Sequence, residues 1–374
     1  MNERKLSAWV EAGVIDAAAA ARIRTYEGQH TRPLALWAVI GIGALAIGLG
    51  LISVVAANWD AIPAMVRLGV HFAVLIGVAA ALWWQAGWLG PWGEEALLFV
   101  FGVLGLTFMG HLGQAYQSTS PLWQPLALWL VLFGPLFVLR GQSWLTALGF
   151  AGALVVAVWS FAAGHDARDG AFLVFALPTA LPLTLAPLGA ALRVRSDRAA
   201  FWRRIEELGF AYALGGASLI AIVAGTTNLI RGGDADKVLM TLLTWAVAGF
   251  AAAALVWTVR RDRSGQAAAA MLAAGATLAL LAYPLSGSQV MGALLFMALW
   301  AVVAAMALRG GWRGVFQFAV AALALRLIVL SFELEDDLLS SGTGLIASGA
   351  LILAVAWVAV RVARKYAPPK EVGP

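Results

Sequence analysis

The amino-acid sequence predicts an all-α protein, a polytopic integral membrane helix bundle with about 12 transmembrane helices. Two observations predict this class. Hydrophobic residues make up 62% of the 374 residues and charged residues only 12%, whereas soluble domains carry about 45–50% apolar and about 25% charged residues. In addition, apolar stretches near the ~20 residues that a spanning helix needs follow one another from Leu34 onward. So few charges cannot cover a soluble globule, which excludes a cytosolic enzyme, a nucleic-acid-binding module and a disordered scaffold.

Residues 1–33 precede the first apolar stretch and are predicted to form a short cytoplasmic helical hairpin. Leu6 and Trp9 are three residues apart, so they share one face of a helix. Gly13 can end that helix in the left-handed conformation, and Asp16 can cap the start of the next one. We expect the hairpin to dock on the membrane surface; a partner-binding or sensing role is the alternative.

The transmembrane bundle is predicted over residues 34–360 and is followed by a cytoplasmic tail at 361–374. Its spans are expected at 34–57, 64–84, 94–112, 124–139, 143–163, 171–192, 207–229, 238–259, 266–283, 289–308, 315–331 and 341–360.

Two of these spans contain proline and are expected to be irregular. The fourth span, 124–139, is short and contains Pro135, so the fourth and fifth spans could instead form a re-entrant hairpin. The sixth span, 171–192, contains three prolines, the first of them Pro178. Each proline leaves a backbone carbonyl without its helical partner, so this span should be kinked or broken. A static kink and the broken helix of a transporter are both open interpretations.

The basic residues are sorted to one side of the predicted spans. If the N-terminus is cytoplasmic, 20 of the 25 Lys and Arg residues fall in cytoplasmic segments, and only Arg168, Arg231 and Lys237 fall in outer loops. Cytoplasmic loops of membrane proteins carry such an excess. We therefore expect both termini in the cytoplasm. The net charge of +5 then reflects topology, and no nucleic-acid partner is needed to explain it.

Ionisable groups inside spans are the usual pointer to function in a membrane protein, and here they gather in the outer half. Arg67 and His71 are four residues apart on the second span, and Arg326 lies near the outer end of the eleventh. We expect an outward-facing polar pocket with Arg67 and Arg326 as its cationic floor, and no comparable groups in the inner half. The candidate pocket residues are Asn58, Asp60, Arg67, His71, His111, Gln114, Arg326 and Glu333.

A local interpretation of the same residues stays open. Asp60 could pair with Arg67, and Arg326 with Glu333, so that each pair holds a loop to a helix while the arginine side chain extends toward water. In that case the outer half contains structural ion pairs and no shared pocket.

Motifs for catalysis, cofactors and metals are absent from the sequence. It contains no metalloprotease, nucleophile-elbow, phosphate-loop or dinucleotide-binding motif. The lack of cysteine excludes thiolate metal sites and disulfides. His71 and His111 could meet across the second and third spans, but two histidines alone are a weak indication of a metal site. We expect no catalytic residue, no cofactor and no metal, and an enzyme is not favoured.

Several motifs together resemble a known family. They are the hairpin pattern Leu6-x-x-Trp9-x-x-x-Gly13-x-Ile15, the run Ala-Ala-Asn-Trp-Asp-Ala-Ile-Pro at 56–63, the turn Gly-Gln-Ala-Tyr-Gln at 113–117, the run Leu-Arg-Leu at 325–327, and Phe332-Glu333. The pattern resembles the bacterial predicted-membrane-protein family called domain of unknown function 2157. The segment 341–360 is similar to the C-terminal part of domain of unknown function 4401, and the middle of the chain matches only as hydrophobic helices. The resemblance implies a bacterial inner-membrane protein, no established activity, and a periplasmic partner protein.

Three functional hypotheses follow from the sequence. The leading one is a transporter-like membrane protein, or one that binds an anionic small molecule or a lipid or glycolipid headgroup in the outward-facing pocket. The second is a non-catalytic membrane scaffold or sensor, whose cytoplasmic hairpin or acidic outer loop beginning at Glu333 recruits a partner. The third, and least favoured, is an enzyme that acts on lipid-linked glycans at the outer face. The lipid bilayer is the one partner that all three require.

Overall fold

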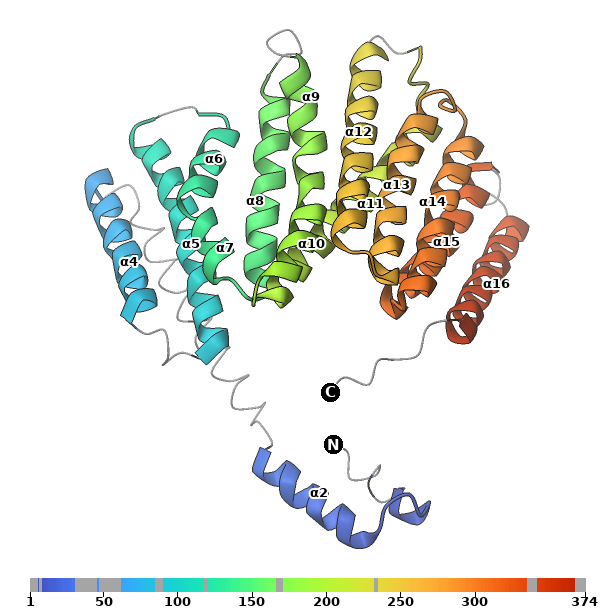
Figure 1. Ribbon diagram of the computed structural model, residues 1–374, viewed down its shortest axis with the longest axis horizontal. Helices are drawn as coiled ribbons and strands as arrows, with labels where there is room; N and C mark the ends of the chain where they lie inside the picture. Colours follow the sequence, from blue (N-terminus) through green and yellow to red (C-terminus); the bar gives the residue numbers. More distant parts are fainter. Residues whose placement is uncertain are drawn as a thin grey trace. The chain divides into compact units, whose positions relative to one another are not determined.

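The structure is a computed structural model that describes residues 6, 9–30, 46, 62–84, 90–117, 120–165, 171–231, 235–334 and 342–366 (Figure 1). Helices and turns make up these residues, and no strand occurs among them. The all-α prediction therefore holds for the part of the chain that is described. By its internal contacts the chain divides into two units, Met1–Arg67 and Leu68–Pro374, which are described separately.

In the first unit, helix α2 (Ala17–His30) follows a tight turn. Gly13 in this turn has φ +68°, in the left-handed region that glycine adopts at little cost. The Oδ1 atom of Asp16 accepts a hydrogen bond from the Ala19 N–H group at 2.5 Å, as the side chain of an N-cap residue does. The glycine turn and the aspartate cap predicted for the hairpin are thus confirmed. The hairpin as a whole stays a prediction, because part of its first helix lies outside the described residues.

The second unit consists of helices that run up and down beside one another (Figure 1). The first of them begins at the end of the first unit. In chain order they are α4 (Ala64–Trp84), α5 (Gly90–Ala115), α6 (Trp123–Leu132), α7 (Gly134–Arg140), α8 (Trp144–Ala163), α9 (Ala171–Ala180), the 3-10 turn η2 (Pro182–Thr184), α10 (Leu185–Arg195), α11 (Ala199–Thr226), α12 (Ala235–Val259), α13 (Arg263–Ala282), α14 (Gln289–Gly310), α15 (Arg313–Leu334) and α16 (Gly342–Tyr366).

Nine spans among the described residues are long and apolar enough to cross a membrane, and the bent pair α6–α7 would make a tenth. Each of the ten coincides with a span predicted from the sequence between residues 64 and 331. Helix α16 covers the last predicted span, and the first one, 34–57, lies outside the described residues. The chain is therefore a membrane protein with many apolar helices that need a lipid bilayer around them, while the count of about 12 stays a prediction.

Proline interrupts two of these spans, as expected. Helices α6 and α7 meet at 43°, with Pro135 in the first turn of α7, so the segment is either a broken span or a re-entrant loop. In the sixth predicted span, α9 ends at Ala180 and α10 begins at Leu185, with η2 between them. The hydroxyl groups of Thr179 and Thr184 donate to backbone carbonyls three or four residues earlier. This span is therefore broken, and threonine hydrogen bonds lie on both sides of the break.

Helices α10 to α14 pack closely because small residues meet at their interfaces. A Cβ atom on Gly292 of α14 would lie 2.5 Å from the Gly225 Cα atom of α11, and one on Gly209 of α11 would lie 2.3 Å from the Ala186 nitrogen of α10. Real Cβ atoms do not come so close. Small residues allow such approach in membranes, where helices associate by packing rather than by the hydrophobic effect. This core is thus fixed by backbone-to-backbone contact.

Candidate functional site

Two imidazole rings of the predicted pocket meet near one end of α4 and α5. We call this the outer end, after the predicted topology, and the opposite end of the helices the inner end. The Nδ1 atoms of His71 on α4 and His111 on α5 are 2.9 Å apart. The Nε2 atom of His71 lies 2.9 Å from the backbone oxygen of Leu104. Both rings are half-buried, and the sequence-based idea that they could meet across two spans is confirmed.

The second outer pair lies on one helix. The Nη1 atom of Arg326 on α15 donates to Oε1 of Glu333 at 2.9 Å, two turns further along. The arginine side chain is 8% exposed and the glutamate side chain 25%. Two atoms of the pair, Nε of Arg326 and Oε2 of Glu333, are buried and have no hydrogen-bond partner among the described residues. This is the local pair that the sequence offered as its alternative.

The remaining pocket candidates do not join these two pairs in the described contacts. Asn58 and Asp60 lie outside the described residues, and Arg67 is the last residue of the first unit. Gln114 is exposed on the last turn of α5. Helix α5 packs on α6 and α8, whereas α15 packs on α14 and α16. The histidine pair and the Arg326 pair are therefore two separate places in the second unit, and a single pocket that includes both stays a prediction.

The inner end contains a buried carboxylate that the sequence did not single out. Glu95, near the start of α5, is 6% exposed. Its oxygens accept hydrogen bonds from the Gln142 backbone N–H and from the hydroxyls of Ser143 and Thr146, the last two at 2.5 and 3.0 Å. These donors lie at the start of α8 and just before it, so Glu95 ties α5 to α8. Such a set of donors is what a buried carboxylate needs.

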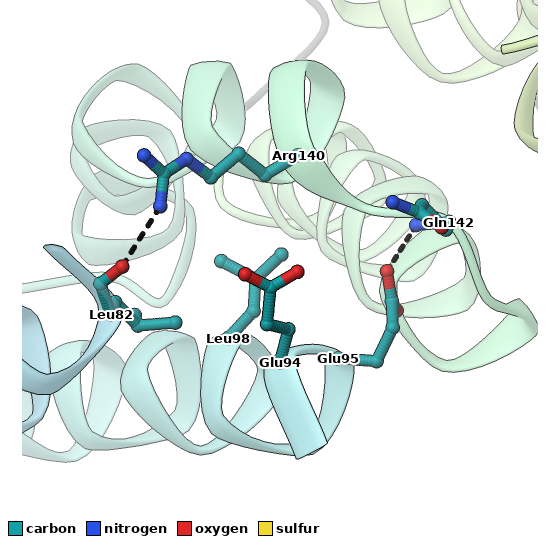
Figure 2. Close-up of a pocket in the computed structure, with 6 residues that line it drawn as sticks. All are labelled: Leu82, Glu94, Glu95, Leu98, Arg140 and Gln142. Carbon is teal, nitrogen blue, oxygen red and sulfur yellow. Dashed lines mark hydrogen bonds between the residues drawn. The ribbon is translucent and has the colours of Figure 1, made fainter. Parts of the chain in front are cut away.

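A small hollow adjoins this carboxylate (Figure 2). Leu82, Glu94, Glu95, Leu98, Arg140 and Gln142 line it. In Figure 2 the Glu94 carboxylate and the Arg140 guanidinium lie on opposite sides, and Arg140 donates to the Leu82 carbonyl at 3.1 Å. The volume of the hollow that the centre of a water molecule can occupy is about 20 Å³, which is room for about one water molecule. The hollow is therefore too small for an organic substrate.

A second buried carboxylate at the inner end joins three helices. Glu206 of α11, whose side chain is 3% exposed, accepts from Arg193 of α10 at 3.1 Å and from Arg260, at the end of α12, at 2.5 Å. Arg260 also donates to the hydroxyl of Ser264 in α13, and that hydroxyl donates to Asp262. This group, which we call the Glu206 cluster, links the inner ends of α10, α11, α12 and α13.

Two inner-end groups outside the apolar spans have shifted pKa values. Burial lowers the pKa of the Arg198 guanidinium, and the nearby Glu95 carboxylate opposes this shift. The hydrogen bond from Ser264, reinforced by the charge of Arg260, lowers the pKa of the Asp262 carboxyl. Ion-pair networks produce such shifts as readily as active sites do, so these values by themselves indicate no reaction.

The expectation that the inner half holds no comparable groups is wrong. Hydropathy predicts that the seventh span begins at residue 207, whereas α11 begins at Ala199 and carries Glu206 inside the bundle. One signal in the sequence could have found it. Glu206 follows the basic segment that begins at Arg193, and an acidic residue at a span start there has cationic partners within reach. Among the described residues, no group of three or more His, Cys, Asp or Glu side chains could hold a metal ion.

Comparison with protein families supports the resemblance found in the N-terminal part. Residues 7–146 match a family model described as "Predicted membrane protein", domain of unknown function 2157. The matched segment contains the histidine pair and Glu95. Comparison with curated proteins and with solved structures found no match. The family description gives a membrane location and no activity, and the likeness of the C-terminal part to domain of unknown function 4401 stays a resemblance.

Proposed function

We propose that this protein is a non-catalytic membrane scaffold or sensor in a bacterial inner membrane. Both termini lie in the cytoplasm in this proposal. The cytoplasmic hairpin of residues 1–33, or the acidic outer loop that begins at Glu333, recruits a cytoplasmic or periplasmic partner protein. The proposal draws its support from one observation, which is the way the bundle uses its buried charges.

Three buried ionisable side chains are each engaged by the protein's own helices. Glu95 accepts from residues at the start of α8, Glu206 from two arginines, and Arg326 donates to Glu333. A charge that binds a transported substrate has to be exposed to water in at least one conformation and to give up its internal partners there. Charges paired in this way favour a bundle that holds one arrangement, which is what a scaffold needs.

Cysteine accessibility tests this proposal against transport. The chain contains no cysteine, so single cysteines can be introduced without background. Three positions are buried in the close-packed core on different helices: Ser218 on α11, Ala246 on α12 and Ala276 on α13. We expect Ser218→Cys, Ala246→Cys and Ala276→Cys to stay unmodified by a membrane-impermeant maleimide added to either face of the membrane.

Two exposed positions on α11 serve as matched controls. Ala200 lies in the first turn of this helix at its inner end and Thr227 follows its last residue at the outer end, and cysteines there should react readily, each from one face. Modification of any of the three core cysteines at a rate near that of the controls would mean that water reaches the core. In that case the scaffold proposal is wrong and a transport path gains support.

An anion-binding site at the outer end of α15 is the second candidate function. The observation that favours it is the buried Nε atom of Arg326, which has no hydrogen-bond partner in the described part of the chain. An anionic small molecule or lipid headgroup could supply the acceptor. In this case phosphatidylglycerol should raise the unfolding temperature of the native chain more than phosphatidylcholine does, and Arg326→Gln should abolish the difference. A folded Arg326→Gln variant with an unchanged lipid response would exclude this site.

A further inference from the structure

Proline leaves one carbonyl of the broken sixth span without its helical donor. In an α-helix the N–H group of each residue donates to the carbonyl four residues earlier. The Leu181 N–H still does so, to the Leu177 oxygen at 3.2 Å. The next residue, Pro182, has no N–H group, so the carbonyl of the buried Pro178 loses its partner just before the break. Inside a bilayer an unpaired carbonyl is costly, because no water is there to replace the donor.

A side chain of another helix supplies the missing donor. The hydroxyl of Tyr212 on α11 donates to the Pro178 oxygen. The indole Nε1 atom of Trp159 on α8 lies 3.2 Å from the same hydroxyl oxygen and donates to it. An indole N–H group only donates, whereas a hydroxyl both donates and accepts. The Tyr212 hydroxyl therefore accepts from Trp159 and gives its own hydrogen to the Pro178 carbonyl, so the two bonds form a chain with one direction.

The surrounding helices hold the tyrosine ring in place. Tyr212 is half-buried, and its ring contacts the buried Trp245 of α12, with ring centroids 5.4 Å apart. Trp245 in turn packs against Gly216, one turn further along α11, where a Cβ atom would overlap the indole ring. Helices α8, α11 and α12 all pack against the 3-10 turn η2 at the break. The position of the hydroxyl is therefore fixed by packing as well as by its two hydrogen bonds.

We propose that Tyr212 clamps the break in the sixth span, with its hydroxyl in the place of the N–H group that Pro182 lacks. A transporter with a broken helix offers its free carbonyls to an ion. Here the carbonyl freed by Pro182 is bonded within the bundle. The clamp thus makes the break a fixed joint between α9 and α10 and not a binding element. It is independent of the scaffold proposal, because it concerns what holds the break and not what the protein recruits.

A double-mutant cycle tests whether the hydroxyl replaces the missing donor of the proline. We expect Tyr212→Phe to lower the unfolding temperature, measured by circular dichroism in detergent, by about 2–4 °C, because the Pro178 carbonyl loses its donor. In Pro182→Ala the backbone regains an N–H group that can donate to that carbonyl. Adding Tyr212→Phe to Pro182→Ala should therefore lower the unfolding temperature by less than about 1 °C.

Tyr283→Phe is the matched control for the loss of a hydroxyl. Tyr283 lies at the end of α13, and its hydroxyl bonds to no described residue. This variant should change the unfolding temperature by the same amount with and without Pro182→Ala. Equal losses from Tyr212→Phe in the two backgrounds would overturn the proposal. A Tyr212→Phe variant that does not fold, and that Pro182→Ala does not rescue, would overturn it as well.

The bond itself can be observed at a single carbonyl. Pro178 is the only proline of the sequence that is followed by threonine. Labelling the proline carbonyls with carbon-13 and threonine with nitrogen-15 therefore selects this carbonyl in a carbon–nitrogen correlation spectrum. A hydrogen bond raises the chemical shift of a carbonyl carbon, so we expect Tyr212→Phe to lower the shift, Pro182→Ala to restore it in the double variant, and Tyr283→Phe to leave it unchanged. An unchanged shift in Tyr212→Phe would show that the clamp does not exist, whatever the unfolding temperatures are.

Discussion

At the scale of the residue, Glu206 shows how an apolar bundle accommodates a carboxylate. Arg193 in α10 and Arg260, just after α12, donate to different oxygens of the same carboxylate. Taking a carboxylate out of water costs several kcal/mol, and partners with good geometry offset that cost. If one charged side chain of the Glu206 cluster is removed, the remaining charges stay buried without their partners. The resulting loss of unfolding free energy is larger than the net stabilisation by the complete cluster.

We expect Glu206→Gln to lower the free energy of unfolding by about 3 kcal/mol. Glutamine keeps the volume but removes the negative charge, so Arg193 and Arg260 would face each other across a neutral amide. Thermal unfolding in detergent, followed by tryptophan fluorescence, measures the change. The neighbouring Glu207→Gln is the matched control, because Glu207 pairs with Arg203 at 2.7 Å in an exposed position. The control should lower the free energy of unfolding by less than about 1 kcal/mol. Equal losses of unfolding free energy in both variants would mean that burial does not make the ion pairs of Glu206 more important for stability than an exposed pair.

Histidine and arginine pairs were predictable to different degrees. The seven-residue spacing of Arg326 and Glu333 put them on nearly the same face of one helix, so their pairing followed from helix geometry. The contact between His71 and His111 needed only that consecutive spans pack side by side. In contrast, Arg260 lies 54 residues from Glu206. No periodicity relates those two positions, and only tertiary packing brings them together, because α10 and α13 each contact both α11 and α12.

At the scale of the element, hydropathy predicted the helices well and their ends less well. All ten spans expected between residues 64 and 331 have a helical counterpart, since the length and apolar character of a span are read directly from composition. The start of α11 shows the limit. Phe201, Trp202 and Ile205 are buried there among charged neighbours. The mean hydropathy of such a segment is low even though one face of the helix is apolar. The predicted span therefore begins at residue 207, eight residues after the start of α11.

The broken sixth span was predictable because proline acts locally. Pro182 begins the 3-10 turn that separates α9 from α10, and no tertiary contact is needed to explain why the helix stops there. The close contacts of α10 with α11 were not predictable in the same way. Gly189 has no room for a Cβ, which would lie 2.4 Å from the Glu206 nitrogen. A glycine in a membrane helix indicates a possible close approach but not its partner.

At the scale of the whole molecule, the inner ends of the helices carry the cations. Helices α7, α10 and α14 end in turns that contain Arg140, Arg193 with Arg195, and Arg309. These turns lie at the same end of the second unit in Figure 1. Some of these arginines also form ion pairs, as Arg193 does in the Glu206 cluster. Their position therefore stabilises the packing of the helices as well as the orientation of the chain in the membrane. A side chain that does both cannot be moved to the other face without loss of stability.

The proposed orientation predicts the outcome of reporter fusions at two points. A fluorescent protein fused after Tyr366, at the end of α16, should fluoresce because this end is cytoplasmic, and alkaline phosphatase at the same point should be inactive. Fusions after Ile230, between α11 and α12, should behave in the opposite way, because α11 crosses from the cationic inner end to an outer end with few Lys or Arg residues. If the two fusion points lie on the same face of the membrane, the chain crosses the membrane an even number of times between Ile230 and Tyr366. That result would overturn the predicted topology and, with it, the proposed cytoplasmic position of both termini.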